Sequence, residues 1–131
     1  MAKIMLADDE QRVRDMVAFK LEATGHRVVP ARDGGEAMSL AAAERPDLII
    51  LDVMMPVMDG FEVLRRLKAD PALHDIPVII LSAKGREQDV MTGIRGGAVD
   101  YIVKPFTLKE LTARVEIALR KHQPEGAAPA D

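Results

Sequence analysis

Five times along this chain of 131 residues, a short run of aliphatic side chains precedes a longer stretch whose apolar residues have helical spacing. The clearest run is Leu48–Leu51, four large apolar residues in succession. Such a run is typical of a strand buried on both faces, as in a parallel sheet. Because the connecting links are short, right-handed crossovers should place the strands in one sheet with helices on both faces. The alternation predicts an α/β fold with a doubly wound, five-stranded parallel sheet flanked by five helices.

The boundaries of the expected elements follow from apolar runs, turn residues and helix caps. The expected strands are Lys3–Ala7, Arg27–Ala31, Asp47–Leu51, Pro77–Leu81 and Val99–Val103. The expected helices run from Gln11 to a stop at Thr24-Gly25, from Glu36 to Glu44, from Asp59-Gly60 to before Pro71, from Arg86 to Arg95, and onward from Thr107. Asp33-Gly34-Gly35 is expected to form a turn, and Thr107 with Glu110 matches a capping box. Glycines near the end of the fourth helix should make it the least stable of the helices.

The order of the strands is not fixed by this pattern alone. Pro30 lacks a backbone donor, which favours an edge position for the second strand. The doubly wound order 2-1-3-4-5 meets that condition and gives a flavodoxin-like three-layer sandwich. In this order the first and third strands flank the switch point, so Asp8, Asp9 and Asp52 should converge there. We expect residues 1–122 to form one folded domain and residues 123–131 to be a flexible tail or linker.

Composition and charge argue against several classes of protein. The formal net charge of -3 argues against general nucleic-acid binding, which usually needs a basic patch or stripe. Without cysteine, the chain has no disulfide, no cysteine metal site and no thiol catalysis. No apolar stretch approaches the roughly 20 residues that span a bilayer, and the apolar start before Asp8-Asp9-Glu10 is too short for a secretory signal. A cytoplasmic location without membrane contact is therefore expected.

The acidic residues at the expected switch point favour metal and phosphate chemistry. Asp8, Asp9 and Asp52 would repel one another, so at least one pKa should be raised unless a cation neutralises them. Their oxygen-only donor set favours Mg²⁺, to which a main-chain carbonyl after Asp52 could add a ligand. A carboxylate beside such an ion can attack a phosphoryl group and form an acyl phosphate. Lys104 and Ser82, at the ends of two other strands, are placed to neutralise and hydrogen-bond the phosphoryl oxygens.

Together these landmarks resemble a bacterial response-regulator receiver domain of the CheY-like superfamily, the phosphoacceptor half of two-component signalling. The resemblance covers residues 3–121, with every landmark in the family's order. It implies that Asp52 accepts the phosphoryl group and that Lys104 pairs with that group. It also implies that Ser82 is the switch hydroxyl and that Tyr101 is the switch aromatic, which moves inward as Ser82 moves.

The same resemblance implies a magnesium site. Asp9 would bind the ion directly and Asp8 largely through water. Asp52 and the main-chain carbonyl of Met54 would complete the protein ligands. The Lys104-Pro105 bond resembles the family's cis peptide, which sequence alone would not predict.

The implied function is a phosphorylation switch. A sensor histidine kinase or a histidine phosphotransfer protein would donate the phosphoryl group to Asp52. The output would be a changed surface on the fourth helix, fifth strand and fifth helix, which binds a downstream protein or a second copy of the chain. Met54 and Lys84 would border the phosphoryl group and influence how fast water removes it. We expect the chain to promote its own phosphotransfer and dephosphorylation, but not to act as an enzyme otherwise or to bind nucleic acid directly.

Several alternatives stay open. A phosphohydrolase of the haloacid-dehalogenase type would need a second Asp two residues after Asp52, where this chain has Met54. A phosphorylation-independent module of the same fold should have lost a site residue, and this chain keeps them all. Taken singly, Asp8-Asp9 could be a helix cap and Tyr101 a core ring. We expect a stand-alone receiver, although residues 124–129 would suit a linker in a larger regulator equally well.

Overall fold

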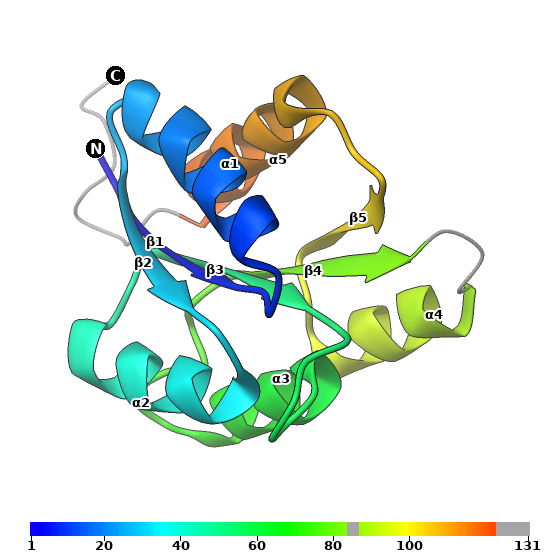
Figure 1. Ribbon diagram of the computed structural model, residues 1–131. Coiled ribbons are helices and arrows are strands. Elements are labelled where there is room, and N and C mark those ends of the chain that lie inside the picture. The colour runs from blue at the N-terminus through cyan, green and yellow to red at the C-terminus, as the bar shows by residue number, and fades with distance from the viewer. Residues whose placement is uncertain (84–86, 123–131) are drawn as a thin grey trace.

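The computed structural model describes residues 1–83 and 87–122 (Figure 1). Its strands are β1 (Lys3–Ala7), β2 (Arg27–Ala31), β3 (Leu48–Asp52), β4 (Val78–Ala83) and β5 (Asp100–Lys104). Its helices are α1 (Gln11–Ala23), α2 (Gly34–Glu44), α3 (Gly60–Ala69), α4 (Glu87–Gly96) and α5 (Leu108–Lys121). None of the helices in these described ranges is long and apolar enough to cross a membrane. The expectations for Lys84 and for the tail at 123–131 fall outside the described residues.

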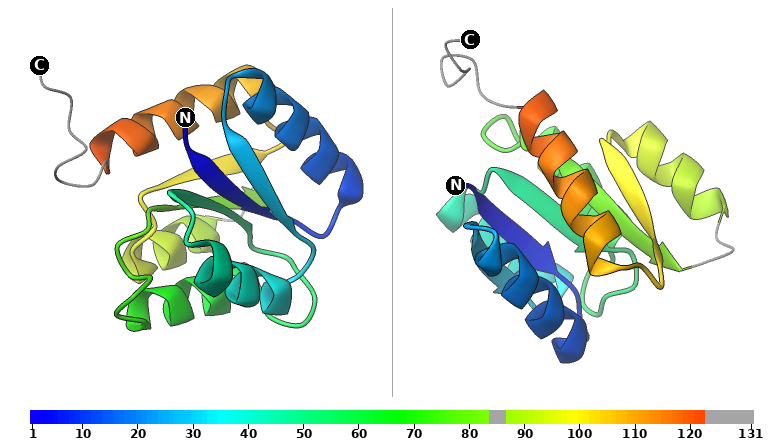
Figure 2. Two further views of the ribbon diagram at one scale, coloured as in Figure 1. Left: turned by 90° about the vertical axis from the view of Figure 1, so that its left-hand side faces the viewer. Right: turned by 90° about the horizontal axis from the view of Figure 1, so that it is seen from above.

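The five strands form one parallel sheet in the order β2-β1-β3-β4-β5, which confirms the expected topology. The edge strand β2 carries Pro30, which is exposed, and an edge strand can turn a missing backbone donor away from its neighbour. Helices α1 and α5 cover one face of the sheet, and α2, α3 and α4 cover the other, as Figures 1 and 2 show. The chain is therefore the expected three-layer sandwich.

Two hydrophobic clusters, one on each face of the sheet, hold these layers together. Successive residues of β1 show the alternation that produces them. Ile4 and Leu6 belong to the cluster with α1 and α5, whereas Met5 belongs to the cluster with α2 and α3. All residues of β3 are buried, as expected for a strand covered on both faces. The run Leu48–Leu51 is thus the centre of the core.

Side-chain caps begin three helices, and each cap accepts a hydrogen bond from the amide three residues further on. The pairs are Asp33 with Glu36, Asp59 with Glu62 and Thr107 with Glu110, at 2.8, 2.9 and 3.0 Å between side-chain oxygen and amide nitrogen.

The expected turn at Asp33-Gly34-Gly35 is wrong, because both glycines belong to the first turn of α2. Gly34 lies so close to the Met58 main chain that any Cβ there would overlap the Met58 carbonyl.

Three strands extend further than their sequence patterns predicted. β3 ends at Asp52, β4 at Ala83 and β5 at Lys104, one or two residues beyond the expected ends. Asp52 is paired in register with Leu81, and Ser82 with Val103. The polar residues expected after the strands are therefore the last or next-to-last residues within them, and the sheet fixes their positions.

Candidate functional site

Three carboxylates gather at the carboxyl ends of β1 and β3, as the sequence predicted. Asp8 directly follows β1, Asp9 comes next, and Asp52 is the last residue of β3. One oxygen from each of the three side chains lies within 4.8 Å of the oxygens of the other two. Asp8 and Asp52 have 0% and 5% of their surface exposed, whereas Asp9 is exposed. Two of the carboxylates are therefore fixed in the core, and one is open to solvent.

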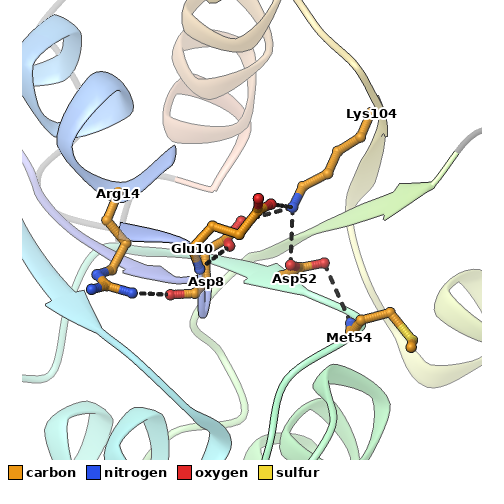
Figure 3. Close-up of polar contacts among 6 residues, drawn as sticks. All are labelled: Asp8, Glu10, Arg14, Asp52, Met54 and Lys104. Atoms are coloured by element: carbon orange, nitrogen blue, oxygen red, sulfur yellow. Dashed lines mark hydrogen bonds and ion pairs between the residues drawn. The ribbon is translucent and has the colours of Figure 1, made fainter. Parts of the chain in front are cut away.

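Lys104 neutralises part of this charge. Its ammonium nitrogen lies 2.9 Å from Oδ2 of Asp8 and 2.9 Å from Oδ2 of Asp52 (Figure 3). Glu10, which the sequence analysis did not single out, has its Oε1 3.6 Å from the same nitrogen. Lys104 is the last residue of β5, so its long side chain reaches from that edge strand to the ends of β1 and β3. One cation thus serves two buried carboxylates and an exposed one.

The electrostatics of the site make Asp52 a weak acid. Burial is the main reason that the pKa of Asp52 rises from 3.8 to about 6; the hydrogen bond from Lys104 opposes this rise, and the charge of Asp8 adds to it. Burial lowers the pKa of Lys104, but hydrogen bonds to Asp8 and Asp52 outweigh burial, so that this pKa is raised overall. Lys104 is therefore charged at neutral pH, and Asp52 is a carboxylate that a further cation would stabilise.

Backbone groups orient both buried carboxylates. Asp8 Oδ1 accepts a hydrogen bond from the Glu10 amide at 2.9 Å, and Asp52 Oδ1 accepts one from the Met54 amide at 3.3 Å. Arg14 Nη1 donates to the main-chain carbonyl of Asp8 at 2.7 Å (Figure 3). These contacts tie the start of α1 and the loop after β3 to the two acidic strand ends.

Three further residues of the expected site lie on or just after β3 and β5. Met54 follows β3, Tyr101 lies on β5, and Pro105 follows β5. Met54 is 62% exposed, and its main-chain amide donates to Asp52. Tyr101, on β5, is partly buried and packs against the hydrophobic cluster on the α2 and α3 face. The peptide bond between Lys104 and Pro105 is cis.

Ser82 contacts helix α4. Its hydroxyl donates a hydrogen bond to Oδ2 of Asp89 at 3.0 Å, and both residues are buried. Ser82 follows Leu81, the β4 partner of Asp52, so it lies beside the end of β3. The sequence analysis missed Asp89. The sequence offered only an acid within a helix, and that signal does not distinguish a buried carboxylate from a solvated one.

The donor set of the site fits a magnesium ion. Its ligand groups are carboxylate oxygens, which Mg²⁺ prefers over nitrogen or sulfur. Mg²⁺ usually keeps several waters and takes one or two protein carboxylates, which suits a site with one exposed side at Asp9. Asp8, Asp9 and Asp52 are the side chains that would hold such an ion.

Sequence comparisons identify related proteins. The family model described as the response regulator receiver domain matches residues 4–116. The DNA-binding dual master transcriptional regulator RpaA of Synechocystis is 44% identical over 121 residues, which cover 92% of this chain and 50% of that protein. The phosphate regulon transcriptional regulatory protein PhoB of Pseudomonas aeruginosa is 43% identical over 121 residues, which cover 92% of this chain and 53% of that protein. The chain therefore spans about half the length of the curated relatives it matches.

A solved structure shares the whole fold. The signal receiver domain of a signal transduction histidine kinase from Syntrophus aciditrophicus matches with a TM-score of 0.87 and 35% identity, and the match covers 100% of both chains. A match of this quality over both whole chains shows that the two share the fold described above. This chain belongs to the family of response-regulator receiver domains.

Proposed function

We propose that phosphorylation of Asp52 switches this receiver, with Mg²⁺ bound by Asp8, Asp9, Asp52 and the main-chain carbonyl of Met54. One observation carries the proposal. Asp52, which is buried and has a raised pKa, lies close to two further carboxylates and to Lys104 at the carboxyl end of the sheet. A lysine shared between two buried carboxylates leaves negative charge that a divalent cation can neutralise.

The phosphoryl donor in this proposal is a phosphohistidine of a sensor histidine kinase or a histidine phosphotransfer protein. A carboxylate oxygen of Asp52 attacks the phosphorus, a P–O bond forms and the P–N bond breaks. The electron pair stays on the imidazole nitrogen, which takes up a proton from solvent. The attacking carboxylate has to be ionised, and its pKa of about 6 keeps it so at neutral pH.

In this proposal Lys104 stabilises the transferred group. Its ammonium nitrogen lies 2.9 Å from Asp52 Oδ2, so a phosphoryl oxygen bound to Asp52 comes within its reach. Mg²⁺, when bound, supplies further positive charge to the phosphoryl oxygens. Attack of water on the acyl phosphate would return Asp52 to its free form, and this self-catalysed pair of reactions is the only chemistry we propose for the chain.

The new charge on Asp52 would bias a two-state equilibrium of the surrounding fold. Ser82 and Lys104 would move onto the phosphoryl group, and Tyr101 would repack along β5. The output surface in this proposal is formed by α4, β5 and α5. Exposed apolar side chains support it as a protein-binding face. They are Met91, Ile94 and Val103, with 50%, 61% and 38% of their surface exposed.

We further propose that residues 1–122 act as a receiver in the cytoplasm and bind proteins and not nucleic acid. The relatives RpaA and PhoB are transcriptional regulators about twice as long as the matched region. This supports a receiver joined through residues 123–131 to a further domain. A stand-alone receiver would instead bind a downstream protein or a second copy of itself through the same output surface.

Intact mass after incubation with acetyl phosphate tests the proposal. We expect one added phosphoryl group on the wild-type chain with Mg²⁺, and none in EDTA or in Asp52→Asn. Asp75→Asn is the matched control, because the Asp75 side chain is 93% exposed in the loop between α3 and β4. That variant should be modified as fully as the wild type.

Two outcomes would overturn this function. The absence of an adduct on the wild-type chain, together with no binding of beryllofluoride, would favour a phosphorylation-independent binding module. An adduct that persists in Asp52→Asn would place the acceptor at another residue.

A further inference from the structure

Ser82 and Asp89 form a hydrogen bond that the transfer chemistry does not use. The Ser82 hydroxyl donates to Oδ2 of Asp89 over 3.0 Å, and only 1% and 8% of the surfaces of the two residues are exposed. Ser82 is the next-to-last residue of β4, and Asp89 is the third residue of α4. The bond therefore joins the strand next to the acceptor to the first turn of α4.

This bond should be stronger than one between two neutral groups. A carboxylate acceptor roughly doubles the strength of a hydrogen bond, and a buried carboxylate that loses a donor is destabilised. Negative charge is also favoured in the first turn of a helix, where Asp89 lies. The Asp89 carboxylate is thus a stable acceptor that holds the Ser82 hydroxyl.

The same hydroxyl has to reach a phosphoryl group on Asp52. Asp52 pairs in register with Leu81, the residue before Ser82, so the hydroxyl lies on the strand next to the acceptor. A serine hydroxyl has a single proton to donate. Donation to a phosphoryl oxygen therefore requires that the hydrogen bond to Asp89 break.

We infer that Asp89 is a positioning residue that holds the Ser82 hydroxyl away from Asp52 until a phosphoryl group competes for it. The inference rests on the proposed function, because it assigns the resting partner of the switch hydroxyl. Asp89 thereby lowers the affinity of the site for a phosphoryl group. Asp89 also couples the site to α4, since loss of the hydroxyl removes a hydrogen-bond donor from the first turn of that helix.

The coupling leads to the proposed output surface. Met91 and Ile94 lie two and five residues after Asp89 on the same helix, and they are 50% and 61% exposed. A rearrangement of the first turn of α4 would therefore move apolar side chains that a partner can contact. The Ser82–Asp89 hydrogen bond thus links β4, the neighbour of the acceptor strand β3, to the helix that carries these side chains.

Binding of beryllofluoride in the presence of Mg²⁺ tests the inference, because beryllofluoride mimics a phosphoryl group on Asp52. The titration can be followed through the fluorescence of Tyr101, the one tyrosine of a chain without tryptophan. Asp89→Ala should bind about tenfold more tightly than the wild type, since the hydroxyl no longer has to leave a charged acceptor. Asp89→Asn keeps a neutral acceptor of the same shape, so it should bind with an intermediate affinity.

Ser82→Ala supplies the matched background, because it removes the donor and leaves Asp89 in place. In that background Asp89→Ala should produce no tightening of beryllofluoride binding. Hydrogen exchange without beryllofluoride gives an independent readout. Amides in the second turn of α4, from Met91 on, can donate to carbonyls of the first turn and should exchange faster in Asp89→Ala and in Ser82→Ala, and to a similar extent in the double variant.

Two results would overturn the inference and leave the proposed function standing. One is unchanged or weaker binding of beryllofluoride by Asp89→Ala. The other is an equal tightening with and without the Ser82 hydroxyl, which would mean that Asp89 acts through the stability of α4 alone. Failure of the wild-type chain to bind beryllofluoride would instead overturn the proposed function, and the inference with it.

Discussion

Asp52 carries its charge at a position where burial disfavours it. Its pKa is about 6 in the folded chain, against 3.8 for the free group. The folded chain therefore binds this proton more tightly than the unfolded chain, and protonation of Asp52 stabilises the fold. That contribution is complete below pH 3.8 and is lost as the pH rises through about 6. At neutral pH the ionised acceptor leaves the fold less stable than a neutral side chain of the same shape would.

Asp52→Asn should accordingly raise the free energy of unfolding when Mg²⁺ is absent. At about 1.4 kcal/mol for each tenfold change in proton affinity, the raised pKa sets this gain at up to about 3 kcal/mol at neutral pH. The gain should shrink as the pH falls toward about 4, where wild-type Asp52 takes up its proton. Urea denaturation of both chains in EDTA at several pH values measures it. A gain that stays constant with pH would contradict this origin.

Val57 has a backbone conformation that its side chain disfavours. Its φ is 73°, in the left-handed region, and the residue is 81% exposed. Such a conformation costs a residue other than glycine about 1–3 kcal/mol. Val57→Gly should raise the free energy of unfolding by about 1 kcal/mol, once the greater freedom of glycine in the unfolded chain is subtracted. In thermal melts, the melting temperature of Val57→Ala should lie between those of the wild type and Val57→Gly. A Val57→Gly chain that melts below the wild type would contradict the proposed backbone strain at this position.

At the scale of elements, glycines in α3 and α4 have different roles. A Cβ added to Gly93, within α4, would have Ile80 Cγ1 as its nearest neighbour at 3.6 Å, an ordinary contact. A Cβ added to Gly60, the first residue of α3, would overlap the main-chain carbonyl of Asp52. Gly60 thus allows α3 to approach the acceptor strand, whereas Gly93 only weakens its own helix.

Substitution by alanine should therefore change stability in opposite directions at these two positions. Gly93→Ala should raise the free energy of unfolding by about 0.5–1 kcal/mol, the usual cost of glycine within a helix. Gly60→Ala should lower it by more than about 1 kcal/mol and slow the phosphorylation of Asp52 by acetyl phosphate, because the displaced carbonyl belongs to Asp52. Urea melts and intact mass measure both effects. Destabilisation by Gly93→Ala would show that α4 packs too tightly for a methyl group.

Helix starts could be predicted from the sequence more reliably than strand ends. The cap at Thr107 depends on residues within one turn, and the structure confirms its bond to the Glu110 amide. Strand ends depend on pairing with neighbouring strands, which the sequence does not show. The polar Ser82 was therefore expected in a loop, although it is paired with Val103. The first turn of α2 was missed for a similar reason, since Gly34 is placed by a contact with Met58 far along the chain.

At the scale of the whole molecule, the topology explains why the acidic cluster was predictable. The carboxyl ends of parallel strands lie at the same end of the sheet, and the strand order places β1 beside β3. Asp8, Asp9 and Asp52 therefore come together. The sequence could not predict that Ser82 would bond to Asp89. That pair depends on how α4 packs on β4 and on a side-chain rotamer, neither of which a sequence pattern specifies.

The fold as a whole should be stabilised by Mg²⁺, because the ends of β1 and β3 form the proposed site only in the folded chain. A ligand that binds only the folded state raises the free energy of unfolding by about 2.7 kcal/mol at 100 times its Kd. Asp9 is exposed, so Asp9→Asn should change the stability of the metal-free chain by no more than about 0.5 kcal/mol. The same substitution should remove most of the rise with Mg²⁺.

Melting temperatures in MgCl₂ and in NaCl of equal ionic strength separate binding of the ion from general screening. Asp15→Asn is the matched control, since Asp15 is an exposed acid on α1 outside the cluster, and it should keep the full rise. An equal rise in Asp9→Asn and in the wild type would mean that Asp9 is not a ligand. No rise above NaCl in the wild type would contradict the magnesium site. Lys104, 2.9 Å from both buried carboxylates, would then be the cation that stabilises this end of the sheet.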